Sequence, residues 1–141
     1  MTGLDRTILA LDHMERDRII EILEQTKGKV SLIKLGVEQF FRYGRELIVE
    51  LHQNYGVEIF LDLKIHDIPA TVAQGIRSLE GLPLKFLTIH LTGGRNMVQE
   101  ALKAQKASLP QTTLLGVTYL TSLGPSDFQE LWGQNPKTTE T

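Results

Sequence analysis

Residues 62–71 read Asp62-Leu63-Lys64-Ile65-His66-Asp67-Ile68-Pro69-Ala70-Thr71. They follow an apolar run at residues 57–61 that is typical of a buried strand. Side chains alternate between the two faces of a strand, so Asp62 and Lys64 are expected on the same face. Opposite charges at a strand end are costly to bury unless they pair, which predicts an ion pair there. Pro69 disfavours a helical Ile68 and can itself open a helix. The stretch therefore predicts a strand–loop–helix junction with a lysine between two aspartates.

Strand-like and helix-like segments alternate on both sides of this junction. The sequence predicts strands at residues 7–12, 30–36, 57–64, 85–90 and 112–119. Apolar residues recur at helical spacing around residues 19–23, 47–55, 71–79 and 98–102. No clear element is predicted from residue 122 to residue 141. This alternation predicts an α/β fold with a parallel sheet and helices outside it.

Each predicted strand ends in a polar residue, and these residues are Asp12, Lys34, Asp62 with Lys64, His90 and Thr121. Barrel and open α/β enzymes both place their active sites at the carboxyl ends of parallel strands. The pattern therefore predicts an active site at this end of the sheet. The alternative is an ordinary set of solvent-facing strand ends.

Five strands leave two architectures open. A (β/α)8 barrel needs eight strands and typically about 250 residues, whereas this chain has 141 residues. A five-stranded doubly wound domain is the alternative. No G-x-G-x-x-G follows the first strand, so a dinucleotide-binding version of that domain has little support.

The composition is that of one globular unit, with 41% hydrophobic and 23% charged residues. A net charge of −2 gives no basic footprint for nucleic acid. The absence of cysteine excludes disulfides and thiolate metal sites. No apolar run approaches the roughly 18 residues of a membrane span, and the N-terminus lacks a signal-peptide pattern. These features predict a cytoplasmic protein with no membrane partner.

The string D-x-K-x-x-D-I-P-x-T at residues 62–71 resembles the signature of the orotidine 5'-monophosphate decarboxylase family. The resemblance extends from residues 9–12 to residues 120–122. It implies a (β/α)8 TIM barrel, of which residues 1–141 are the N-terminal part of a single domain and supply about the first five βα units. The second half of that domain is absent from the sequence. The resemblance also implies cofactor-free decarboxylation of orotidine 5'-monophosphate (OMP) to uridine 5'-monophosphate (UMP) in pyrimidine biosynthesis, without a metal, by a homodimer with shared active sites.

The resemblance assigns the catalytic roles to four residues. Lys64 matches the lysine that protonates C6 of the pyrimidine as carbon dioxide leaves. Carboxylates on both sides favour the cationic lysine, which suits an acid and opposes Schiff-base chemistry. Asp62 matches the carboxylate near the departing group. Asp67 matches the second aspartate of the motif, and it reaches the active site of the other subunit. Lys34 matches the lysine that completes a network of alternating charges, with Asp62 as its expected partner.

Substrate contacts are implied for Asp12, Lys34, Ile68, Thr71 and Thr121. Asp12 matches an aspartate that binds a ribose hydroxyl, and its alternative role is to cap the following helix. Thr71 matches a threonine that contacts the ribose and phosphate from the other subunit. Thr121 matches a hydroxyl residue that contacts the pyrimidine, although Ser122 offers a second alignment.

The histidines receive no catalytic role. His90 is expected to support the site rather than to react. His13, His52 and His66 show no metal-ligand spacing.

Two rival functions remain. The magnesium-dependent sugar-phosphate decarboxylases and hexulose-phosphate synthases of the same superfamily share D-x-K-x-x-D. They carry a glutamate at the end of the second strand, where this chain has the cation Lys34, and they lack the Ile-Pro-x-Thr continuation. The other rival is a non-catalytic barrel fragment that acts as an assembly module. The phosphate-binding loops of the family lie in the second half, beyond this sequence.

Overall fold

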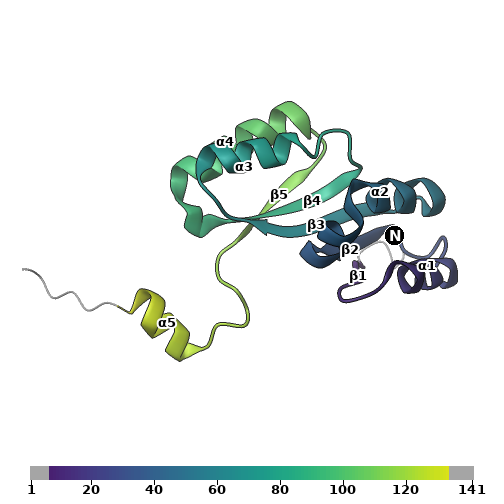
Figure 1. The fold of residues 1–141 in the computed structure, drawn as a ribbon, viewed down its shortest axis with the longest axis horizontal. Coiled ribbons are helices and arrows are strands. Elements are labelled where there is room, and N and C mark those ends of the chain that lie inside the picture. The colour runs from purple at the N-terminus through teal and green to yellow at the C-terminus, as the bar shows by residue number, and fades with distance from the viewer. Residues whose placement is uncertain (1–6, 134–141) are drawn as a thin grey trace, which may run out of the picture.

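The computed structural model describes residues 7–133 as a five-stranded parallel sheet with helices between the strands (Figure 1). The strands are β1 (Leu9–Ala10), β2 (Leu32–Gly36), β3 (Glu58–Ile65), β4 (Leu84–His90) and β5 (Thr113–Val117). The helices are α1 (Arg16–Gln25), α2 (Val37–Tyr55), α3 (Pro69–Arg77), α4 (Gly94–Ser108) and α5 (Pro125–Trp132), with a short 3-10 turn, η2, at Leu91–Gly93.

The strands lie in the order β1-β2-β3-β4-β5, and every neighbouring pair is parallel. A doubly wound sheet reverses its strand order at a switch point, and this sheet does not. Because crossover connections are right-handed, a sequential order places successive helices on the same side of the sheet. The strand order therefore excludes the doubly wound alternative and is that of a barrel wall.

The core lies between the sheet and α1 to α4. Alternate strand residues point into it, such as Ile33 and Leu35 of β2 and Ile59 and Leu61 of β3, all almost fully buried. The residues between them belong to the other face of the sheet. On that face the rings of Phe60 and Phe86 meet edge to face at 5.8 Å. Lys34 and Asp62 lie on this face towards the carboxyl ends of their strands, and Glu58 lies on it at the start of β3.

The last helix differs from the sequence prediction, which placed no element after residue 122. α5 occupies Pro125–Trp132, and Figure 1 shows it apart from the other helices. Pro125 opens the helix, and Asp127 accepts a hydrogen bond from the Gly124 N–H at 2.7 Å. The rings of Tyr119, Phe128 and Trp132 contact one another at 4.7 to 5.2 Å. None of the helix residues is buried, although Phe128, Leu131 and Trp132 recur at helical spacing.

Two other boundaries also differ. The strand expected over residues 7–12 has only the ladder residues Leu9–Ala10. α2 begins at Val37, well before the predicted stripe at residues 47–55. Gly44 lies inside it with φ 64° and ψ −157°, so two helical pieces join at a kink there.

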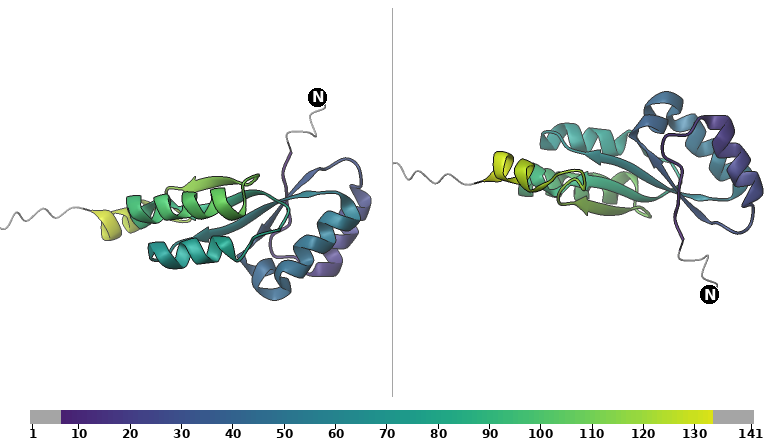
Figure 2. Two further views of the ribbon diagram at one scale, coloured as in Figure 1. Left: turned by 90° about the horizontal axis from the view of Figure 1, so that it is seen from above. Right: turned by 90° about the horizontal axis from the view of Figure 1, so that it is seen from below.

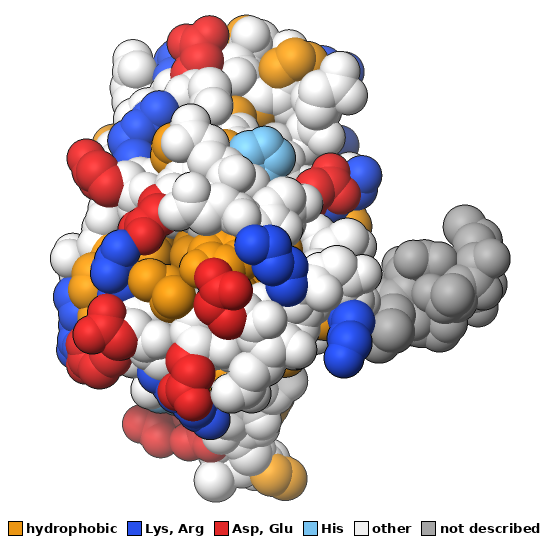
Figure 3. Space-filling model, turned by 90° about the vertical axis from the view of Figure 1, so that its right-hand side faces the viewer, with side chains coloured by type: hydrophobic (Ala, Val, Ile, Leu, Met, Phe, Trp, Pro, Cys, Tyr) orange, Lys and Arg blue, Asp and Glu red, His pale blue; other side chains and the backbone are white. Residues whose placement is uncertain are grey.

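The two further ribbon views show the same elements from above and below (Figure 2). On the face in Figure 3, acidic and basic side chains are interspersed rather than gathered by sign. Ion pairs such as Arg42 with Glu38 and Arg16 with Glu50 account for this mixing on α1 and α2. Of the helices within residues 7–133, none combines the length and the apolar composition that a membrane span requires.

Candidate active site

Four charged side chains form a chain of alternating sign at the carboxyl ends of β1, β2 and β3. Lys34 Nζ donates to Asp12 Oδ2 and lies 3.8 Å from Asp62 Oδ2. Lys64 Nζ donates to the same Asp62 oxygen at 2.5 Å. The parallel register of the three strands brings together residues that span positions 12 to 64 of the chain. The partner expected for Lys34 was Asp62, and the structure places Asp12 closer.

These four residues line a cleft of about 260 Å³, here named the charged cleft. Its remaining walls are His13, Gly36, Val37, Glu38 and Gln39. Gly36 leaves room for the carboxylate of Asp12, because a Cβ at this position would lie 3.0 Å from Asp12 Oδ1. The cleft can therefore hold a small anionic or hydroxyl-rich ligand against two cations and two carboxylates.

Asp62 is the most buried charge of the cleft, with a side chain 13% exposed. Burial alone would raise the pKa of its carboxyl group. The hydrogen bonds from Lys64 and Thr88, together with the positive charge of Lys34, outweigh burial and hold the pKa of Asp62 below its ordinary value. Asp62 is thus an ionised carboxylate at neutral pH, fixed between two lysines.

The backbone at Lys64 is irregular. Its φ of 48° lies in the left-handed region, which costs a non-glycine residue about 1–3 kcal/mol. The pairing of β3 with β4 shifts register between Leu61 and Ile65. The Lys64 N–H donates to Thr88 Oγ1 at 2.8 Å. The regular alternation expected from the sequence is thus interrupted at the central lysine, and its ammonium group still reaches Asp62.

The second half of the motif lies elsewhere. Asp67 and Thr71 line a separate cavity of about 290 Å³, here named the apolar cavity, together with Phe40, Phe41 and Leu63. Among the described residues Lys64 forms an ion pair with Asp62 and none with Asp67. Asp67 Oδ1 instead accepts the N–H of Ile68 at 2.6 Å.

Ile68 precedes α3 and is 67% exposed, so it is presented outward rather than towards the charged cleft. Val37 lines both cavities. Asp62 and Lys64 at the start of the motif therefore line the charged cleft, whereas Asp67 and Thr71 towards its end line the apolar cavity.

Two further predicted residues have clear positions. Glu15, not Asp12, is the N-cap residue of α1, so the alternative role of Asp12 as a helix cap is wrong. Thr121 lies in the exposed turn after β5, outside the set of described residues that line the charged cleft.

His90 ends β4 beside the site. Its ring lies 5.2 Å from that of His66, tilted by 31°. Burial lowers the pKa of His90, and the charges of His66 and Lys64 lower it further. Its Nδ1 atom is buried and has no hydrogen-bond partner among the described residues. Within residues 7–133, no three His, Asp or Glu side chains gather as a metal site would require.

Sequence reasoning missed two polar residues here. Thr88 contacts both Asp62 and Lys64, and period-2 counting along β4 could have found it, because it shares a face with His90. Gln39 accepts the Gly36 N–H at 3.2 Å, and its side-chain nitrogen is buried without a partner among the described residues. No sequence signal distinguishes Gln39 from other polar residues of α2.

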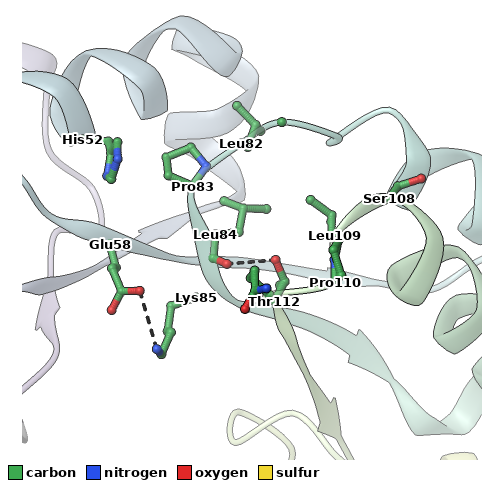
Figure 4. A pocket seen from close by; sticks show the side chains of 12 residues that line it. His52, Glu58, Leu82, Pro83, Leu84, Lys85, Ser108, Leu109, Pro110 and Thr112 are labelled. Atoms are coloured by element: carbon green, nitrogen blue, oxygen red, sulfur yellow. Dashed lines mark hydrogen bonds and ion pairs between the residues drawn. The ribbon is translucent and has the colours of Figure 1, made fainter.

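A larger cavity of about 480 Å³ lies at the other end of the sheet (Figure 4). Lys85 and Glu58 form an ion pair at 3.5 Å there, and Thr112 donates a hydrogen bond to the Leu84 carbonyl. These charged and hydroxyl groups are therefore already paired with each other or with the backbone. Because active sites of α/β barrels lie at the carboxyl ends of the strands, the smaller charged cleft is the candidate active site.

Sequential parallel strands with helices between them, and a polar site at the carboxyl ends of the strands, are typical of α/β-barrel proteins. Within that class, the chain belongs to the Orotidine 5'-phosphate decarboxylase / HUMPS family, whose model matches residues 5–141. It is 37% identical over 131 residues to the orotidine 5'-phosphate decarboxylase of Carboxydothermus hydrogenoformans. It is 41% identical over 124 residues to that of Opitutus terrae. These matches cover 90% and 88% of this chain.

Solved structures agree with this assignment. The orotidine 5'-phosphate decarboxylase of Lactobacillus acidophilus matches 93% of this chain with a TM-score of 0.77 and 37% identity. An uncharacterized conserved protein from Geobacillus kaustophilus matches 89% of it with a TM-score of 0.81 and 32% identity. The chain covers 59% and 60% of those structures, and it spans about half the length of the curated relatives it matches. That the five βα units are the first part of the barrel remains a prediction.

Proposed function

We propose that the complete protein decarboxylates orotidine 5'-monophosphate to uridine 5'-monophosphate in cytoplasmic pyrimidine synthesis. The observation that carries the proposal is the alternating row Asp12–Lys34–Asp62–Lys64 at the carboxyl ends of adjacent strands. Relatives at 37–41% identity bear the name of this activity. Residues 1–141 supply one part of the barrel domain, so the activity is proposed for the protein that carries the rest of it.

Lys64 acts as the acid in this proposal. When the bond from C6 to the carboxylate breaks, its electron pair stays on C6. The Lys64 ammonium donates a proton to that carbon and regains one from water afterwards. A lysine hydrogen-bonded to an ionised carboxylate at 2.5 Å is held in the charged form that this step needs.

Asp62 and Lys34 complete the electrostatic environment. Asp62 is held ionised beside the departing carboxylate, where like charge disfavours the bound substrate relative to the carbanion. Lys34 separates Asp62 from Asp12 and leaves Asp12 with an oxygen for a ribose hydroxyl. The proposed contact of Thr121 with the pyrimidine remains a prediction.

The reaction is proposed to need neither metal nor organic cofactor. Lys34 stands at the end of β2, where the magnesium-dependent rivals carry a glutamate, and a cation there repels Mg²⁺. The test is turnover of orotidine 5'-monophosphate by the complete protein with and without a chelator. We expect equal rates. A chelator-sensitive activity that Mg²⁺ restores would overturn the proposal, as would a folded protein that leaves this substrate unchanged.

We further propose a homodimer in which each subunit sends Asp67, Ile68 and Thr71 towards its partner's charged cleft. Asp67 and Thr71 line a cavity separate from their own Lys64, and Ile68 lies between them in the chain. The surrounding surface exposes Phe41 (82%), Ile68 (67%) and Val37 (44%). A two-fold axis through such a patch would bury it and bring both sets of borrowed residues into place together.

A further inference from the structure

Thr88 is a buried threonine in the middle of β4, and only 4% of it is exposed. Its hydroxyl group donates to Asp62 Oδ1 at 2.8 Å and accepts the Lys64 N–H at 2.8 Å. It thereby joins the two central residues of the charged cleft, although it is not among the residues that line that cleft. We propose that Thr88 is a positioning residue for the decarboxylation proposed above, holding Asp62 and Lys64 in their working geometry.

The hydrogen bonds of Asp62 account for this role. Thr88 occupies Oδ1, and Oδ2 is left for the ammonium groups of Lys64 at 2.5 Å and Lys34 at 3.8 Å. Without the hydroxyl group, the carboxylate is free to rotate and to share both oxygens with the lysines. Thr88 therefore fixes which Asp62 oxygen faces the proton donor.

The backbone of Lys64 depends on the same hydroxyl group. A residue at φ 48° is strained, and such strain persists only where its surroundings hold it. The local register shift of β3 against β4 interrupts the regular ladder around Lys64, and its N–H bonds to the Thr88 hydroxyl instead. A valine at position 88 would leave this part-buried N–H without that acceptor, and an unsatisfied N–H shielded from water is destabilising.

A single hydroxyl group can serve both neighbours. It has one proton to donate and lone pairs to accept, so it accepts from the Lys64 amide and donates to the Asp62 carboxylate at once. The bond to Asp62 also contributes to the lowered pKa of that carboxyl group. Thr88 thus links the strained backbone of Lys64 to the orientation of the Asp62 carboxylate.

The test compares Thr88→Val with Thr88→Ser and with a matched control, Thr112→Val, in the complete protein. Thr112 is also a buried threonine, 5% exposed, directly before β5, and its hydroxyl group donates to the Leu84 carbonyl at 2.8 Å at the far end of the sheet (Figure 4). Both valine variants replace a buried threonine hydroxyl group by a methyl group. Only Thr88 is hydrogen-bonded to residues of the charged cleft.

We expect Thr88→Val to lower kcat by about 10- to 100-fold, the range for a hydrogen bond to a charged group, with a smaller change in KM. Thr88→Ser should recover most of kcat, and Thr112→Val should keep it. Carboxyl carbon NMR should show a higher pKa for Asp62 in Thr88→Val, and an unchanged one in Thr112→Val. If Thr88→Val does not fold, Thr88→Ala replaces it in both measurements.

Wild-type kcat in a folded Thr88→Val protein would overturn the proposal. Equal losses in the two valine variants, without a shift in the Asp62 titration, would overturn it too, because they would reveal general destabilisation. The Asp62 titration does not depend on turnover. A parent protein without decarboxylase activity would therefore sink the proposed function, and the titration would still decide whether Thr88 controls Asp62.

Discussion

Replacing Lys64 by alanine should separate catalysis from stability, and Lys85 provides a matched control. The two lysine side chains are similarly exposed, at 40% and 45%, and each pairs with a carboxylate. Lys64 lies 2.5 Å from Asp62 in the charged cleft, whereas Lys85 lies 3.5 Å from Glu58 at the opposite end of the sheet. Exposed ion pairs contribute about 0–1 kcal/mol. We therefore expect Lys85→Ala to lose a few tenths and Lys64→Ala roughly 1 kcal/mol of unfolding free energy, because Asp62 is the more buried partner.

The effect on turnover should be far larger for Lys64→Ala than for Lys85→Ala. A positioned acid contributes about 10²- to 10⁴-fold, which corresponds to about 3–5 kcal/mol of transition-state stabilisation. Loss of the cation beside the developing carbanion adds to this. Lys64→Ala should thus fall at least 100-fold in kcat, and Lys85→Ala should stay near wild type.

The assay is the ultraviolet absorbance change as orotidine 5'-monophosphate is consumed, with denaturant titration of each variant for stability. If folded Lys64→Ala keeps kcat within about tenfold of wild type, Lys64 is not the acid, because a missing acid should lower kcat at least 100-fold. That role is equally refuted if both alanine variants lose the same activity, because the two positions would then matter only through stability.

Three other outcomes are expected. Inactive Lys64→Ala and Asp67→Ala proteins, mixed with verified subunit exchange, should regain activity at about one site in four, because about half the dimers are mixed and each has one intact site; no recovery would place Asp67 in its own chain's site. Lys64→Gly should have an unfolding free energy roughly 0.5–1 kcal/mol above that of Lys64→Ala, because glycine accepts φ 48° without strain. An equal or lower denaturation midpoint for Lys64→Gly would contradict a strained backbone. Burial, His66 and Lys64 lower the pKa of His90 in the folded protein. The unfolding free energy that neutral His90 contributes should therefore be lost as the pH falls below about 6.5, the ordinary pKa of histidine. The stability of His90→Gln should therefore vary less in that window, and an unchanged pH profile would argue against it.

Much of the fold could be predicted because strands and helices leave different periodicities in the sequence. Ile33 and Leu35 flank Lys34 in the alternation that a strand requires, and the structure buries the first two and leaves Lys34 at the cleft. Strand order is a tertiary property, so the sequence left the barrel and the doubly wound sheet as alternatives. α5 was not predicted because the chain from residue 122 is polar and rich in Gly and Pro, although Phe128, Leu131 and Trp132 have helical spacing within it.

The members of the charged cleft could be predicted because parallel strands bring their carboxyl ends to one edge. Asp12, Lys34, Asp62 and Lys64 meet for that reason alone. Period-2 counting puts Thr88 on the face of His90, but a threonine suits any strand, so only its two hydrogen bonds reveal its role. The positive φ of Lys64 was equally hidden, since lysine has no preference for it and the surrounding structure imposes it.

The residues of the motif lie at two different cavities. Asp67 follows Lys64 by only three positions, yet Lys64 lines the charged cleft and Asp67 lines the apolar cavity, with Val37 lining both. The left-handed backbone at Lys64 lies where the chain passes from one cavity to the other. A single subunit thus presents a lysine inward and an aspartate outward. Two copies related by a two-fold axis would turn each outward aspartate into a neighbour of the other's lysine, so the short spacing of the motif is itself an argument for the proposed dimer.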